Sequence, residues 1–151
     1  MNLQAMLALN QAHEKETSVL DAKALQDLVD QTFHLPLRAE GRDGFLIALD
    51  QDAVYASVNF AWFKAKFPRF VYVDRIIVAE SARGQGLARS MYEELFAAAR
   101  AKGHERVCAE VNKLPPNPAS DAFHAALGFE VIGEAELANG KTVRYFRRTL
   151  K

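Results

Sequence analysis

The segment from Phe70 to Gly103 constrains the fold of this chain more than any other. Phe70 to Val78 is a run of β-branched and aromatic residues, apolar except at two positions, which is typical of a buried central strand. A glycine turn, Arg83-Gly84-Gln85-Gly86, follows it. From Leu87 the apolar residues recur at helical spacing until Gly103, a typical helix end. We interpret this strand, turn and helix as a candidate phosphate-binding unit.

The glycine turn could hold an anionic diphosphate. Gly84 and Gly86 let neighbouring backbone N–H groups crowd together, and the positive end of the helix dipole adds to their attraction for an anion. By spacing alone, a tight strand-to-helix turn without a ligand also explains the glycines. No Gly-Lys-Ser/Thr follows, so a P-loop is excluded. A dinucleotide-binding motif could use Glu110 after the next strand, but Arg89 stands where its third glycine belongs.

Length and composition are those of one ordinary folded domain. The chain has 151 residues, of which 50% are hydrophobic, and 19 Lys and Arg balance 19 Asp and Glu. A chain of this length can bury roughly 70% of the surface that it exposes when unfolded, so it needs no metal or disulfide to hold a core. We expect a single domain over residues 1–151. The balanced charge gives no general attraction to nucleic acid or anionic membranes, so neither is expected as a partner.

The cysteine and histidine content indicates a metal-free protein of a reducing compartment. Cys108 is the single cysteine, cannot form a disulfide within the chain, and is expected to be a packed thiol among apolar neighbours. The four histidines lack metal-ligand spacing. The apolar residues from Leu3 to Leu9 are too few to cross a bilayer and lack the basic flank of a secretory signal. We therefore expect a cytoplasmic protein.

The remaining apolar patterns predict further helices and strands. Helical spacing is found from Leu3 to Asn10, from a cap at Asp21 to Thr32, and from Asn117 to Leu127. Strand patterns are found from Phe33 to Arg38, Phe45 to Leu49, Arg106 to Val111, Phe129 to Ile132 and Thr142 to Phe146. The first two strands flank Gly41-Arg42-Asp43-Gly44, which predicts a β-hairpin.

Residues 50–68 show no clear period and are predicted to form a long loop with room for one helical turn. The segment is unusually aromatic, with Tyr55, Phe60, Trp62, Phe63 and Phe67. Such residues belong more often to a core than to a binding site. The segment is nevertheless long enough to cover a ligand, and its mixed charges favour neither a cationic nor an anionic one.

Two segments resemble the GNAT (Gcn5-related) N-acetyltransferase family. Arg83-x-x-Gly86-x-Ala88, after a strand that ends at Val78, is similar to the family's acetyl-CoA signature. Asn117-x-x-Ser120, followed by Phe123, His124 and Leu127-Gly128-Phe129, is similar to its next segment. The resemblance covers residues 70 to about 132. It implies an α/β domain with a mixed, largely antiparallel central sheet, helices on both faces and a central strand pair that splays apart at the cofactor cleft.

The resemblance also implies where acetyl-CoA, the cosubstrate, would bind. The strand through Ile76, Ile77 and Val78 would hydrogen-bond the pantetheine arm, which would enter between this strand and the strand from Arg106 to Val111. Backbone amides would hold the pyrophosphate at Arg83, Gly84, Gln85, Gly86, Leu87, Ala88 and Arg89. Asn117 and Ser120 would contact the cofactor arm, although Asn117 before Pro118 is also a standard helix start.

The implied reaction is direct transfer of the acetyl group to an amine, without a metal. An alkyl ammonium with a pKa of about 10.4 is only about 0.04% neutral at pH 7, so a proton must leave before attack, and the thiolate must gain one. A small-molecule amine and a peptide or protein amino group all remain as acceptors, and a homodimer is left open. A non-catalytic acyl-CoA-binding or sensing module of the same fold is the alternative.

Two residues are candidates for proton transfer. His124 stands where the family often has a tyrosine that protonates the thiolate, seven residues after Asn117 on the same helix face. A helix-surface histidine without a catalytic role is the alternative. Asp74 interrupts the apolar strand where some family members have an acidic residue near the acceptor. Because a buried carboxylate is costly, we expect Asp74 to accept a proton, to anchor the ammonium, to pair with Arg75, or to lie at the open end of the strand.

Overall fold

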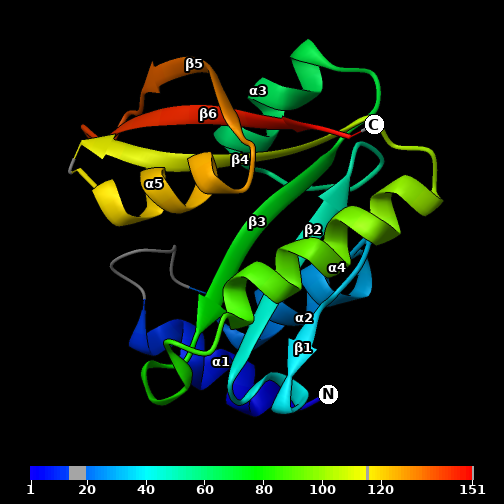
Figure 1. Ribbon diagram of the computed structural model, residues 1–151, viewed down its shortest axis with the longest axis vertical. Helices are drawn as coiled ribbons and strands as arrows, with labels where there is room; N and C mark the ends of the chain where they lie inside the picture. The colour runs from blue at the N-terminus through cyan, green and yellow to red at the C-terminus, as the bar shows by residue number, and fades with distance from the viewer. Residues whose placement is uncertain (14–19, 115, 151) are drawn as a thin grey trace.

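The strands lie in one mixed sheet. The computed structural model describes residues 1–13, 20–114 and 116–150, and within them six strands follow the order β1-β2-β3-β4-β6-β5 (Figure 1). Their bounds are β1 Leu37–Arg38, β2 Gly44–Asp50, β3 Val71–Val78, β4 Arg106–Leu114, β5 Glu130–Glu136 and β6 Thr142–Thr149. Neighbouring strands are antiparallel except β3 and β4, which are parallel. The predicted mixed, largely antiparallel sheet is confirmed.

Helices cover both faces of this sheet. They are α1 Leu3–Ala12, α2 Ala22–Asp30, α3 Val58–Lys66, α4 Leu87–Ala101 and α5 Pro118–Ala126, and short 3-10 turns span Ala39–Gly41 and Glu80–Ala82. Leu95 of α4 and Leu127 at the end of α5 are buried in one hydrophobic cluster. Met6 of α1, Leu28 of α2 and Phe63 of α3 are buried in another, on the opposite face. The prediction of helices on both faces is also confirmed.

Two predicted helix starts have the expected caps. The Asp21 carboxylate accepts a hydrogen bond from the backbone N–H of Ala24 at 2.7 Å, and the Asn117 side chain accepts one from Ser120 at 3.3 Å. Each bond satisfies a backbone donor that has no partner within its own helix. Both signals are local in sequence, which explains why they could be read without the structure.

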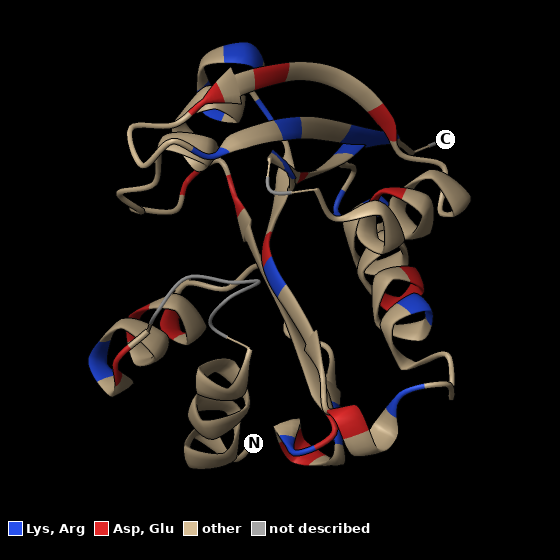
Figure 2. Cartoon of the chain, turned by 90° about the vertical axis from the view of Figure 1, so that its left-hand side faces the viewer, with Lys and Arg blue, Asp and Glu red and all other residues tan. Residues whose placement is uncertain are grey.

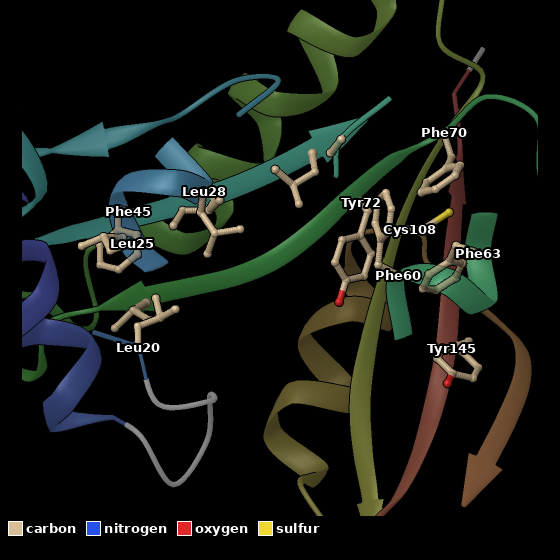
Figure 3. Close-up of a cluster of buried hydrophobic side chains, with 14 of the residues drawn as sticks. Leu20, Leu25, Leu28, Phe45, Phe60, Phe63, Phe70, Tyr72, Cys108 and Tyr145 are labelled. Carbon is tan, nitrogen blue, oxygen red and sulfur yellow. The ribbon is translucent and has the colours of Figure 1, made fainter. Parts of the chain in front are cut away.

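The segment 50–68 is the largest departure from the sequence prediction. It holds a nine-residue helix, α3, rather than a loop with one helical turn. The Ser57 side chain caps it by accepting from the backbone N–H of Phe60 at 3.3 Å. Figure 3 shows Phe60 and Phe63 packed with Tyr72 of β3 in the buried cluster. Packing against the sheet stabilises this helix, and its weak sequence period does not reveal that packing.

The predicted hairpin near the N-terminus is present, but its first strand is shorter than expected. Leu37 and Arg38 pair with β2, while His34 makes an isolated bridge to Ala48. Pro36 has no backbone N–H, so a regular ladder cannot run through it. The last two strands are longer than expected, because β5 and β6 form a hairpin that pairs along nearly their whole length.

β3 and β4 separate soon after they begin. Among the described residues they pair at Val71 with Val107 and at Tyr72 with Cys108. Beyond these pairs the two strands diverge (Figure 1), because β3 continues alongside β2 and β4 continues alongside β6. The predicted splayed strand pair is present. Its facing backbone edges no longer bond to each other, which leaves them available to a ligand.

Candidate active site

A cavity of about 460 Å³ lies where β3 and β4 separate. Asp74 and Ile76 line it from β3, and Glu110 lines it from β4. Further lining comes from α3, α4, α5 and the turn between β5 and β6. The cavity therefore brings unpaired strand edges together with titratable side chains, and it is the candidate active site.

A hydrogen-bond network holds the carboxyl group of Glu110 at this cavity. Tyr72 donates from its hydroxyl to Oε1 at 2.6 Å, and Asn59 donates from Nδ2 to the same oxygen at 3.0 Å. The amide oxygen of Asn59 accepts from the Tyr145 hydroxyl at 2.9 Å, which fixes the orientation of that amide. Figure 3 shows the hydroxyls of Tyr72 and Tyr145 on the same side of the aromatic cluster. Both donors bind Oε1, so Oε2 is the oxygen that neither donor occupies.

Glu110 has the protonation behaviour that a general base requires. Burial raises the pKa of its carboxyl group to about 7, and the negative charge of Asp74 also raises it, while the hydrogen bonds from Tyr72 and Asn59 lower it. A carboxyl group with this pKa takes up and releases a proton near neutral pH.

Asp74 lines the same cavity but is already paired. Its Oδ2 accepts from Nε of Arg75 at 2.6 Å, and the side chains of Arg75 and Asp74 are only 2% and 4% exposed. Arg75 also donates from Nη1 to Oδ1 of Asn10 at 2.7 Å. Burial raises the pKa of nearby Tyr55, and the charge of Asp74 raises it further. The ion pair that we expected as one alternative is therefore present, and it offsets the charge that Asp74 offers to an acceptor.

His124 lies on α5 with both ring nitrogens engaged. Nδ1 is 2.8 Å from the backbone carbonyl oxygen of Ser120, which can only accept, so Nδ1 carries a proton. Nε2 of the neutral ring then accepts from the hydroxyl of Tyr92, which is 2.9 Å away. Burial lowers the pKa of His124, so the neutral ring predominates at pH 7. Tyr92 and His124 both line the cavity and act as one hydrogen-bonded pair.

The glycine turn borders a second cavity of about 330 Å³. Gly84 and Gly86 have φ values of +82° and +73°, in the left-handed region that favours glycine. Apart from each glycine and its chain neighbours, no described residue has an atom within 4 Å of the place where a Cβ would sit. No side chain among the described residues caps α4, so its first backbone N–H groups face this open space. An uncapped helix start of this kind fits a diphosphate.

Most of the other residues expected to bind acetyl-CoA line one of the two cavities. Ile76 lines the first cavity and Val78 the second, whereas the side chain of Ile77 is buried in the core on the opposite face. Asn117 and Ser120 line the first cavity from α5. Around the turn the second cavity is lined by Arg83, Gly84, Gly86, Leu87, Ala88 and Arg89, and Gln85 is exposed between them.

Glu110, Asn59 and Tyr92 are site residues that the sequence prediction did not identify. In β4 Val107, Ala109 and Val111 are buried on one face, and Glu110 lies on the other face with Cys108. Glu110 is the one acidic residue of this strand, and that was the available signal. Asn59 lies in the helix that was predicted as a loop, where the Ser57 cap was a second signal. Nothing local distinguished Tyr92 from a core residue of α4.

We expect Gly86→Val to abolish the thermal stabilisation that coenzyme A gives the wild type. A β-branched side chain is strained at φ +73° and would fill the space beside the first N–H groups of α4. A ligand at about 100 times its Kd stabilises by about 2.7 kcal/mol, or roughly 5–10 °C for a chain of this size.

Gly103→Val is the matched control for this test. Gly103 has φ +76° and follows the opposite end of α4, and apart from its chain neighbours no described residue has an atom within 4 Å of its Cβ position. It should lose a similar amount of intrinsic stability yet keep the shift with coenzyme A. A folded Gly86→Val protein with an undiminished shift would remove the turn from the binding site.

Within the described residues, no helix is long and apolar enough to cross a membrane. In the same part of the chain, no three His, Cys, Asp or Glu side chains gather where they could share a metal ion. Lys and Arg are interspersed with Asp and Glu over the helices and strands (Figure 2).

The splayed strand pair, the uncapped helix start and the carboxyl group in the first cavity fit an acyltransferase of the α/β class. The family model described as the acetyltransferase (GNAT) family matches residues 6–129. The chain belongs to this family, and the resemblance seen in its two motifs is confirmed.

Three individual proteins illustrate the similarity, at sequence identities between 14% and 26%. The L-2,4-diaminobutyric acid acetyltransferase of Wolinella succinogenes is 26% identical over 121 residues, which span 75% of this chain and 70% of that protein. The ribosomal-protein-S18-alanine N-acetyltransferase of Escherichia coli has a TM-score of 0.70 at 16% identity, over 99% of this chain and 88% of that one. Ard1 of Thermoplasma volcanium has a TM-score of 0.74 at 14% identity, over 100% and 95%. These two structures support the fold.

Proposed function

We propose that this protein transfers the acetyl group of acetyl-CoA directly to an amine, with Glu110 as the general base. The observation that carries the proposal is the Glu110 carboxyl group, which has a pKa of about 7 and lies in the cavity between the diverging strands. A base with this pKa is suited to removing a proton at neutral pH. Membership of the acetyltransferase family supports the class of reaction.

The geometry of the two cavities supports acetyl-CoA as the acetyl donor. The first N–H groups of α4, with Gly84 and Gly86, fit the pyrophosphate. The edge of β3 that carries Ile76 and Val78 leads from there to the first cavity, and its free backbone groups can bond the amides of a pantetheine arm. Asn117 and Ser120 border the same path. Bound acetyl-CoA supplies an activated thioester, and the protein must orient it and move two protons.

The first proton leaves the acceptor ammonium. Oε2 of Glu110 takes it, directly or through a water molecule, and about half of the carboxyl groups are ionised at pH 7 when the pKa is about 7. The neutral amine can then form a bond to the acetyl carbon while the bond from that carbon to sulfur breaks, and the nitrogen releases a further proton to water as it becomes an amide. Asp74 acts on Glu110 rather than on the acceptor in this scheme, because its charge raises the pKa of Glu110 while its own carboxylate is held by Arg75.

The second proton must reach the departing thiolate, and Tyr92 and His124 are placed to supply it. The Tyr92 hydroxyl proton goes to sulfur, and Nε2–H of a protonated His124 replaces it on the hydroxyl oxygen, 2.9 Å away. A lowered pKa makes protonated His124 a ready donor, although less of it is present. His124 therefore acts through Tyr92.

The proposed reaction accommodates more than one class of acceptor amine. One relative acetylates an amino acid and a structural neighbour acetylates an alanine of a ribosomal protein, according to their names. Both a small amine and a peptide amino group are therefore included in the test.

The experiment is a release assay for coenzyme A with acetyl-CoA and a panel of amines. The panel holds L-2,4-diaminobutyrate, L-ornithine and L-lysine, the diamines that lack their carboxylate, and a peptide that begins with alanine. We expect coenzyme A and acetylated amine to appear in equal amounts with at least one member. A thermal shift with coenzyme A but no turnover on any amine would favour the acyl-CoA-binding module, and the absence of both would contradict acetyl-CoA as a ligand.

A further inference from the structure

Lys141 is a cation at the first cavity whose side chain has no ion-pair partner among the described residues. It lies in the turn between β5 and β6 and lines the cavity together with Leu137 and Asn139. The other Lys or Arg that lines this cavity, Arg75, is bound to Asp74. Lys141 is thus the lining cation that is available to a ligand.

Nearby basic side chains on the same part of the sheet behave differently. Lys113 of β4 pairs with Glu134 at 2.8 Å, and Arg144 of β6 pairs with Asp121 at 2.9 Å. Neither lies in the lining of the cavity. Lys141 therefore differs from the neighbouring basic residues in two ways: it lines the cavity, and it forms no ion pair with a described residue.

The backbone of the turn holds Lys141 in place. The backbone N–H of Leu137 donates to the carbonyl oxygen of Lys141 at 2.7 Å, and the N–H of Lys141 donates to Oδ1 of Asn139 at 3.0 Å. These two bonds close the hairpin. The ammonium group can still move on its flexible stem, so it can adjust to a ligand.

The strand register relates Lys141 to Glu110. Glu110 lies opposite Tyr145 in the β4–β6 ladder. Lys141 directly precedes β6 and lies four residues before Tyr145, which is about 13 Å of extended chain at roughly 3.3 Å per residue. Val143 lies between them and lines the cavity, as do both Lys141 and Glu110. One cavity thus has a base at one end and an unpaired cation farther along the same strand pair.

We propose that Lys141 binds a carboxylate of the acceptor, which makes the acceptor an amino acid whose reacting amine is several bonds away from its carboxylate. The inference rests on the proposed function, because Glu110 marks where the amine reacts. A diamine without a carboxylate offers Lys141 no anion and brings a second ammonium towards it, which is unfavourable. The separation of the two residues along the strand pair favours an acceptor whose amine and carboxylate are several bonds apart.

The test compares each diamino acid of the amine panel with the diamine of the same carbon chain that lacks the carboxylate. We expect the wild type to have the lower KM for the amino acid of each pair. Lys141→Met should raise that KM about tenfold with little change in kcat, since a hydrogen bond to a charged group contributes about 1.5 kcal/mol or more. The KM for the diamine should stay the same or fall.

Lys113→Met is the matched control, because it removes a lysine that is paired with Glu134 and lies outside the cavity lining. It should leave both values of KM unchanged. Equal use of diamines and amino acids by the wild type, preferred use of the peptide, or an unchanged KM in Lys141→Met would overturn the inference while leaving the proposed function intact. Failure to acetylate any amine would instead reject the proposed function.

Discussion

Glu110→Gln is expected to lower kcat by about 100-fold to 10,000-fold while acetyl-CoA binding stays nearly unchanged. A glutamine side chain keeps an oxygen that can accept from Tyr72 and Asn59 but cannot take a proton from the acceptor. General bases typically contribute to catalysis by this amount. The measurement is kcat at saturating acetyl-CoA, with the thermal shift by coenzyme A as the check on binding.

The pH dependence gives a second readout of the same residue. In the wild type, kcat/KM should rise with pH as the base ionises. The slope of this rise should change near pH 7, because the pKa of Glu110 is about 7. The bend should vanish in Glu110→Gln measured with the same amine. Asp74→Asn should move the bend to lower pH, since it removes a negative charge that raises the pKa of Glu110. A larger loss in Asp74→Asn than in Glu110→Gln would make Asp74 the base.

Stability provides a test that does not depend on turnover. The folded-state pKa of Glu110 lies above the ordinary value of 4.5, so its stabilising contribution is fully present at low pH and is lost as the pH rises through about 7. Glu110→Gln lacks this titration. Its free energy of unfolding should therefore increase relative to that of the wild type as the pH rises from 5 to 8. Glu134→Gln is the control, because Glu134 pairs with Lys113 outside the cavity lining and should affect neither activity nor this pH trend.

His124→Phe and Tyr92→Phe are each expected to lower kcat by roughly 100-fold, and the double variant should be little worse than either. The reason is the shared hydrogen bond between Nε2 and the Tyr92 hydroxyl at 2.9 Å, through which both residues would serve one proton transfer. Two residues that act as a unit lose their joint contribution when either is removed. The measurement is kcat at saturating substrates for the three variants.

His104→Phe is the matched control for these variants. His104 is also a buried histidine that packs against an aromatic ring, Phe33, but it does not line the cavity. It should keep full turnover if fold and coenzyme A binding are intact. If His124→Phe keeps full turnover from pH 6 to 9, the histidine has a structural role alone and water or the substrate supplies the proton. Losses that add in the double variant would separate the roles of Tyr92 and His124.

The sequence by itself determined the parts of this protein that depend on short segments. The strand to Val78, the turn with Gly84 and Gly86, and α4 follow one another closely, so their order and their hydrophobic pattern were enough to predict them. The caps at Asp21 and Asn117 were equally local. Two such segments in the right order were also enough to indicate the family.

Only the tertiary structure distinguished the two carboxyl groups of the cavity as candidates for the base. Asp74 was visible in the sequence as a charge in an apolar strand, yet the ion pair with Arg75 holds it. Glu110 receives its hydrogen bonds from Tyr72, 38 residues away, and from Asn59, 51 residues away. Its pKa depends on burial by those elements and on the distance to Asp74. Burial and charge separation arise when distant segments pack together, so no short pattern in the chain could have set them.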